Sequence, residues 1–121
     1  MTFEEAQLAL DEIACALPQA IFRMLNGGYV LTPQTVTDDE GLVILGQYHC
    51  EPLGLGRYVT VHYGSLLQLY GHYSENKFRE KLKEVLHHEL THHLENLAGD
   101  RSLEIQDEID RARYLHLNDD E

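Results

Sequence analysis

The chain has 121 residues, of which 43% are hydrophobic and 25% charged, and its formal net charge at pH 7 is −12. This size and composition predict one globular domain, residues 1–121, with a hydrophobic core that needs no disulfides. The acidity argues against nucleic-acid binding and against binding to anionic membranes, and no apolar run approaches the length of a membrane span. No secretory signal opens the sequence. We therefore expect a soluble cytoplasmic protein in which Cys15 and Cys50 are reduced thiols.

The N-terminal region is predicted to be helical. Between residues 3 and 17, apolar side chains recur every three or four positions, which is typical of an amphipathic helix. Thr2 is a candidate N-cap and forms a capping box with Glu5. Pro18 interrupts the pattern and can begin a second short helix, which ends at residues 26–28, Asn-Gly-Gly.

The middle of the chain is predicted to form a small, mainly antiparallel sheet. A short strand is expected at 29–31, and residues 32–40 read as a loop. Residues 42–49 and 57–63 predict an antiparallel hairpin. The continuous apolar run that opens its first strand suggests an inner strand, and the alternation of its second suggests a half-exposed one. Residues 64–71 fit a strand or a short helix, and we expect a strand or turn there.

The C-terminal third is predicted to contain two helices. Ser74 is a good N-cap for a helix that runs to about Ala98 and stops at Gly99. A second helix is expected at 102–116. On a helical wheel, one broad sector of the first helix is apolar. Its members are Phe78, Leu82, Val85, Leu86, Leu90, Leu94 and Leu97.

A metal-binding motif lies in the first of these helices. Residues 88–92 read His-Glu-Leu-Thr-His, an H-E-x-x-H pattern, so His88 and His92 share one helix face at the edge of the apolar sector. Two imidazoles one turn apart can hold one zinc ion, with Glu89 beside them as general base. His93 is directed toward the core and is expected to be buried and hydrogen-bonded, whereas His87 points away from the pair, toward the surface.

The third metal ligand is less well defined by the sequence. A metzincin continuation would require Gly and His or Asp at positions 95 and 98, which are Glu95 and Ala98. A glutamate from the following helix could complete a His-His-Glu set, and Glu104 is the first choice, ahead of Asp107. Glu95 is the alternative, either as a ligand or as a hydrogen-bond partner of a ligand histidine. Zinc is the expected ion, although such ligands also suit iron.

The motif belongs to a longer pattern that resembles a family of very small bacterial zincin-like metallopeptidases. The similar segments are 24–28, ILGQYH at 44–49, GRYVTVHYGS at 56–65 and LHHELTHHLENLAGDRSLEIQDE at 86–108. The resemblance implies a minimal zincin-like α+β fold, in which a small sheet packs on an N-terminal helix, an H-E-x-x-H helix and a C-terminal helix. It also implies His88 and His92 as ligands, Glu89 as base and an acidic group among Glu95, Glu104 and Asp107.

The expected function is that of a zinc-dependent peptidase acting on a peptide or protein substrate. The hairpin at 42–63 could align an extended substrate by strand addition. Tyr63, Tyr70 and His62 are candidate donors to an oxyanion, although a core position is the more ordinary role for the tyrosines. The alternative is a non-catalytic metal-binding or protein-interaction module on the same scaffold.

Overall fold

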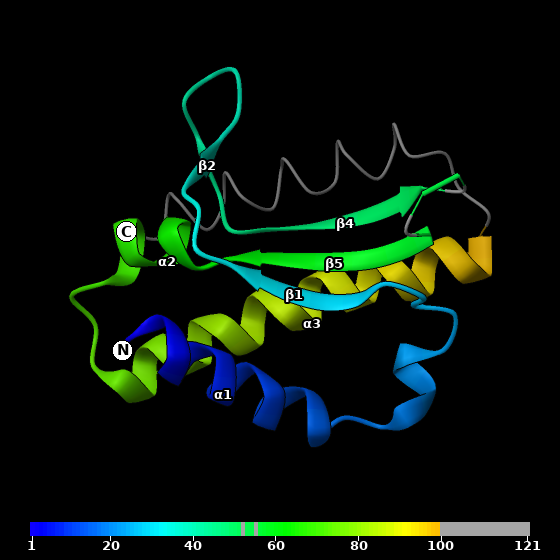
Figure 1. The fold of residues 1–121 in the computed structure, drawn as a ribbon, viewed down its shortest axis with the longest axis horizontal. Coiled ribbons are helices and arrows are strands. Elements are labelled where there is room, and N and C mark those ends of the chain that lie inside the picture. Colours follow the sequence, from blue (N-terminus) through cyan, green and yellow to red (C-terminus); the bar gives the residue numbers. More distant parts are fainter. Residues whose placement is uncertain (52, 55, 100–121) are drawn as a thin grey trace.

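The computed structural model of this protein describes residues 1–51, 53–54 and 56–99, and it has an α+β architecture. Two helices, α1 (Phe3–Cys15) and α3 (Glu75–Gly99), lie on the same side of a three-stranded sheet (Figure 1). The other helical elements are η1 (Gln19–Phe22) and α2 (Tyr63–Tyr70). The strands are β1 (Gly28–Thr32), β2 (Val36–Thr37), β3 (Val43–Ile44), β4 (Gly46–Glu51) and β5 (Gly56–His62).

The main sheet has the order β1-β5-β4 and is mixed rather than mainly antiparallel. The predicted hairpin is confirmed, because β4 and β5 are antiparallel, with Tyr48 opposite Val59. However, β1 runs parallel to β5, with Leu31 opposite Val61. A parallel pair needs a long crossover, and here that crossover contains β2, β3 and β4.

The expected positions of the two hairpin strands are reversed in the structure. Strand β5 is central and carries the fully buried Val59 and Val61, whereas β4 is at the edge. The apolar run that suggested an inner strand is not part of β4. Its residues Val43 and Ile44 form β3, which pairs with β2 in a separate two-stranded sheet. The prediction that this apolar run forms an inner strand of the hairpin was therefore wrong, because the run contributes to β3 instead.

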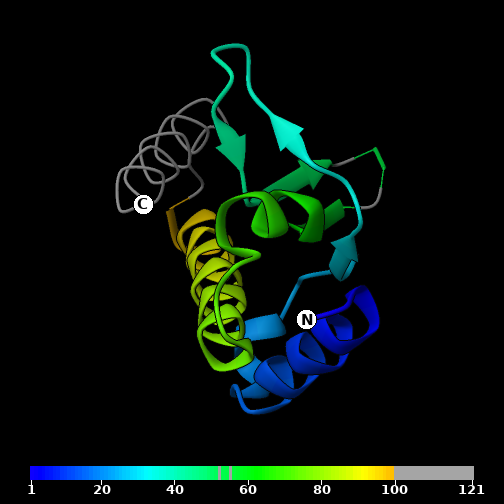
Figure 2. The same cartoon turned by 90° about the vertical axis from the view of Figure 1, so that its left-hand side faces the viewer.

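The segment 64–71 is helical, not a strand or turn. Leu66, Leu69 and Tyr70 follow helical spacing and are buried, so tertiary packing selects α2. At its start, the Ser65 hydroxyl accepts a 2.9 Å hydrogen bond from the Val36 N–H. This contact anchors the β2–β3 hairpin, which projects away from α1 in both ribbon views (Figures 1 and 2).

The predicted N-terminal caps of the first helix and of the long helix are confirmed. Thr2 and Glu5 form the expected capping box at α1. The Ser74 Oγ accepts from the Lys77 N–H at 3.3 Å and caps α3, which is described as far as Gly99, so the predicted stop at that residue lies at the limit of the described range. Pro18 precedes a 3-10 turn, η1, in place of a short α-helix, and this turn ends at Phe22 rather than at residues 26–28. The helix predicted at 102–116 lies outside the described residues. Within the described ranges, no helix is long and apolar enough to cross a membrane.

The long helix α3 approaches the edge strand β4 very closely. A β-carbon placed on Gly46 would lie 2.6 Å from Val85 Cγ1 and 3.0 Å from the Thr60 carbonyl oxygen. The first distance is shorter than packed carbon atoms tolerate and the second is at the tight end of real contacts, so any larger residue at this position would force the helix or the strand to shift. The contact fixes the spacing of α3 and β4 beside the H-E-x-x-H turn.

Replacing Gly46 with alanine should therefore destabilise the fold. We expect Gly46→Ala to lower the free energy of unfolding by about 1–3 kcal/mol, because the added methyl group meets a side chain and a backbone carbonyl that cannot both move aside. Urea denaturation measures this loss. Gly54→Ala is the control, since its β-carbon would meet only the Glu51 side chain. Equal stability of the two variants would contradict this account of the contact.

Candidate functional site

The three residues of the H-E-x-x-H motif are brought together in the middle of α3. His88 and His92 are 7% and 2% exposed, and Glu89 is fully buried. The two imidazole Nε2 atoms lie 3.0 Å apart, and the rings meet edge to face with centroids 4.4 Å apart. The predicted convergence of the two histidines on one face of a buried helix is thus observed.

The arrangement of this pair fits a shared metal ion. Zinc binds imidazole nitrogen at about 2.0–2.1 Å. Because 3.0 Å is less than twice that distance, one point in space can lie at bonding distance from both Nε2 atoms. A shared ion there would need no change of backbone, since both histidines are held on consecutive turns of one helix.

Glu89 lies against the edge strand. Its Cγ is 3.4 Å from where a Gly46 β-carbon would stand, so the carboxylate-bearing side chain occupies the boundary between α3 and β4. Burial strengthens the electrostatic interactions of a carboxylate by removing competing water. The candidate base is therefore shielded from bulk water and lies one residue from His88.

Glu95 contacts His92 on the ring edge that does not face His88. Its Oε1 lies 3.1 Å from the His92 Nδ1. This is the contact expected if Glu95 is the hydrogen-bond partner of a ligand histidine, one of the two roles that the sequence allowed. The His92 side chain is 3% exposed, whereas that of Glu95 is 58% exposed.

His93 confirms the prediction of a buried, hydrogen-bonded histidine. It is fully buried, its Nε2 lies 2.7 Å from the Arg23 carbonyl oxygen, and its Nδ1 lies 2.9 Å from the Tyr48 hydroxyl. A carbonyl can only accept, so Nε2–H donates and Nδ1 accepts from Tyr48. Burial lowers the pKa of His93 and raises that of Tyr48 to about 12, which keeps both groups neutral.

Sequence reasoning missed the contribution of Tyr48 and Asn96 to this helix–sheet contact. Asn96 Oδ1 accepts from the Arg57 Nε at 3.0 Å and lies 3.4 Å from the Tyr48 hydroxyl oxygen. The sequence does show that Tyr48 alternates with outward-facing residues on its strand. This alternation predicts that Tyr48 faces the core, but it does not identify the residues that Tyr48 contacts. Contacts across a sequence separation of 45–48 residues depend on strand register, which local patterns do not fix.

The predicted third ligand is not tested by the structure. Glu104, Asp107 and their neighbour Glu108 lie outside the described residues. Over residues 1–51, 53–54 and 56–99, no three histidine, cysteine or acidic side chains are grouped so as to hold a metal ion. The described part of the site is therefore a two-histidine pair with an adjacent buried glutamate.

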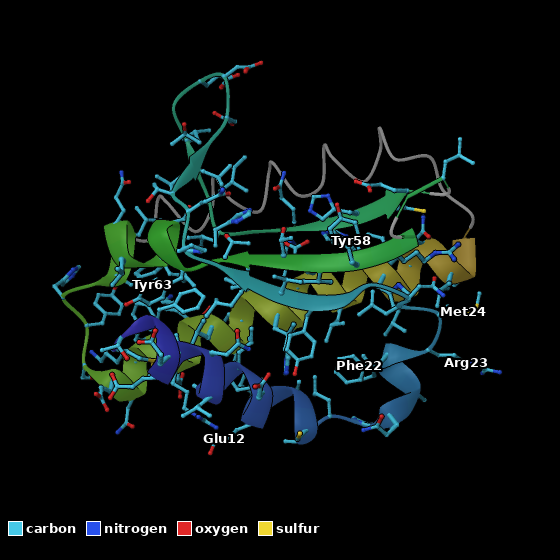
Figure 3. The ribbon with its side chains drawn as sticks, in the orientation of Figure 1. Glu12, Phe22, Arg23, Met24, Tyr58 and Tyr63 are labelled. Atoms are coloured by element: carbon cyan, nitrogen blue, oxygen red, sulfur yellow. The ribbon has the colours of Figure 1, made fainter. Side chains whose placement is uncertain are left out.

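The candidate oxyanion donors occupy other parts of the fold. The Tyr63 hydroxyl donates to the Met1 carbonyl, and its ring packs edge-on against Phe3, at the start of α1 (Figure 3). Tyr70 is buried in the core, with the Lys81 ammonium 4.9 Å from its ring centroid. Both tyrosines have the ordinary core role. His87 is half-buried rather than on the surface, in an apolar groove beside Leu17 and Ile21.

His62 is held on the opposite face of the sheet from α3. Its Nδ1 lies 2.9 Å from the Thr32 hydroxyl and its Nε2 lies 3.1 Å from the Gln47 side-chain oxygen, so one strand on each side contributes a partner. It is 4% exposed. Burial, reinforced by the nearby His49, lowers the pKa of His62 from 6.5 to about 4.

The comparisons with known proteins assign no activity. No family model matches the chain, and no curated protein matches it. A solved structure of a conserved hypothetical protein from Thermo thermophilus is similar, with a TM-score of 0.80 and 28% sequence identity over 95% of this chain and 96% of that chain. The described α+β architecture thus recurs over nearly the whole of another chain. The resemblance to zincin-like metallopeptidases stays a prediction.

His62 should make the fold less stable in mild acid. Its pKa is depressed in the folded state, so below pH 6.5 the unfolded chain binds a proton that the folded chain does not. Stability should fall as pH decreases from 6.5 to about 4, by as much as about 3 kcal/mol for this group. Urea denaturation across this range, compared with His62→Gln, isolates the effect. Identical pH slopes for the two proteins would contradict it.

Proposed function

We propose that this protein is a zinc-dependent metallopeptidase with a compact zincin-like fold, in which His88 and His92 bind the metal and Glu89 is the general base. The observation that carries the proposal is the 3.0 Å approach of two buried imidazole Nε2 atoms beside a fully buried glutamate. Burial of such groups is costly, which makes a convergent set of buried histidines and a carboxylate a candidate functional site.

The metal, when bound, supplies a Lewis acid that polarises the scissile carbonyl and acidifies a water molecule. The protein's own groups do the rest. His88 and His92 hold the site on one rigid helix. Glu89 accepts the proton of the attacking water at its carboxylate and delivers it to the nitrogen of the leaving amine. Its side chain is fully buried and its Cγ packs beside Gly46 of β4, next to the histidine pair.

A third protein ligand would come from the acidic residues after Gly99. We keep Glu104 as the first choice and Asp107 as the second, because a glutamate from the helix that the sequence predicts at 102–116 could complete a His-His-Glu set, and Glu95 stays the alternative. Two histidines with one carboxylate and an open position are the ligand set of a catalytic zinc site. Another divalent ion, such as iron, would suit the same ligands.

The position of β4 at the edge of the main sheet favours an extended peptide as the substrate. The His62 N–H donates to the Leu45 carbonyl at 2.9 Å, so in this antiparallel ladder the backbone groups of Gly46, Tyr48 and Cys50 point away from β5. No described strand pairs with that side of β4. An extended peptide could add there by main-chain hydrogen bonds, beside Glu89.

The direct test is peptide hydrolysis by the zinc-loaded protein and by Glu89→Gln. We expect the wild-type protein to cleave members of a peptide library and the variant to lose about 10²–10⁴-fold in kcat, because it lacks the proton acceptor. Bound zinc should stay the same. Glu84→Gln, an exposed position on the same helix, is the control and should keep full activity.

Two outcomes would contradict the proposal. An unchanged rate in Glu89→Gln would show that Glu89 is not the base. A zinc-loaded wild-type protein that cleaves no peptide would favour the alternative function, a non-catalytic metal-binding or interaction module built on the same helix pair.

A further inference from the structure

We propose that Glu95 is a positioning residue that fixes the tautomer and the orientation of His92. The expected effect of Glu95 on metal binding rests on the proposed function, whereas the contact between Glu95 and His92 is present in the structure without a metal. The contact joins Glu95 Oε1 to His92 Nδ1 over 3.1 Å, between residues three apart on α3. This spacing brings the two side chains to the same side of the helix.

The chemistry of the contact determines where the proton of His92 resides. A carboxylate can only accept, so the His92 Nδ1 must carry the hydrogen and donate it. In a neutral imidazole the other nitrogen, Nε2, is then unprotonated and presents its lone pair. That nitrogen is the one that lies 3.0 Å from the His88 Nε2. Glu95 thus prepares the lone pair that a metal ion requires.

Two sets of contacts determine the orientation of the His92 ring, one made by His93 and one made by Glu95. His93, the next residue, is tied to the Tyr48 hydroxyl and the Arg23 carbonyl, which fixes the rotation of the helix about its axis. The direction of the bond from Cα to Cβ in His92 is thereby set. The Glu95 carboxylate then restrains the remaining rotation of the imidazole, whose side chain is only 3% exposed.

Hydrogen bonds of this kind raise the basicity of a ligand histidine, and their loss weakens metal binding by about 10- to 100-fold. Glu95 is itself exposed, so its contact with His92 contributes little to the stability of the fold. Its expected effect is therefore on the state of His92 and on the metal affinity, rather than on folding.

The test is the tautomer of His92 in the metal-free, full-length protein, read from imidazole ¹⁵N chemical shifts at pH 8, where an ordinary histidine is neutral. Wild type should show the Nδ1–H form. Glu95→Ala should shift His92 toward the Nε2–H form that free histidine prefers. Glu95→Gln should keep the Nδ1–H form, because its amide oxygen can still accept. Glu80→Ala, another exposed glutamate on α3, is the control and should change nothing.

Zinc affinity provides the second measurement. Competition with a chelator should show a 10- to 100-fold loss in Glu95→Ala and a smaller loss in Glu95→Gln. The inference is overturned if wild-type His92 is in the Nε2–H form, or if Glu95→Ala leaves the tautomer unchanged. Failure of the wild-type protein to bind zinc would instead contradict the proposed function, and the tautomer would still decide the role of Glu95.

Discussion

The interaction on which the site depends is the attachment of α3 to β4 through His93. This fully buried imidazole donates to the Arg23 carbonyl and accepts from the Tyr48 hydroxyl, and so joins the helix to the edge strand and to the segment before β1. Gly46 allows the same two elements to approach closely. Because successive helix residues point about 100° apart, fixing His93 also fixes the direction of His92 beside it.

The cluster of histidines on α3 is therefore divided by helix geometry. His93 faces the sheet and has a structural role, while His88 and His92 converge on a neighbouring face, and His87 lies in an apolar groove on a third. Residues of one chemical type thus have different surroundings within seven positions. The similar solved structure supports a shared fold and names no activity, so the functional argument depends on the side chains of the site.

Local patterns predicted much of this arrangement. The N-terminal caps of α1 and α3 follow from local side-chain chemistry and the burial of His93 follows from helical periodicity, both of which a single sequence contains. The parallel pairing of β1 with β5 and the edge position of β4 do not, because register depends on contacts between distant residues. The ambiguous run at 64–71 lies almost wholly in α2 (Tyr63–Tyr70) because Leu66 and Tyr70 pack into the core, and the local sequence does not determine this tertiary packing. The candidate ligands Glu104 and Asp107 lie beyond the described part of the chain.

The measurement that tests the account most directly is zinc binding, followed by stoichiometry and X-ray absorption at the zinc edge. We expect one zinc ion per chain, with two imidazole nitrogens at about 2.0–2.1 Å. His88→Ala and His92→Ala should abolish stoichiometric binding, whereas His87→Ala, a histidine in the same cluster on another face, should retain it. Zinc that stays bound in both of the first two variants, or a coordination shell without imidazole, would contradict the central claim that this pair is the metal site.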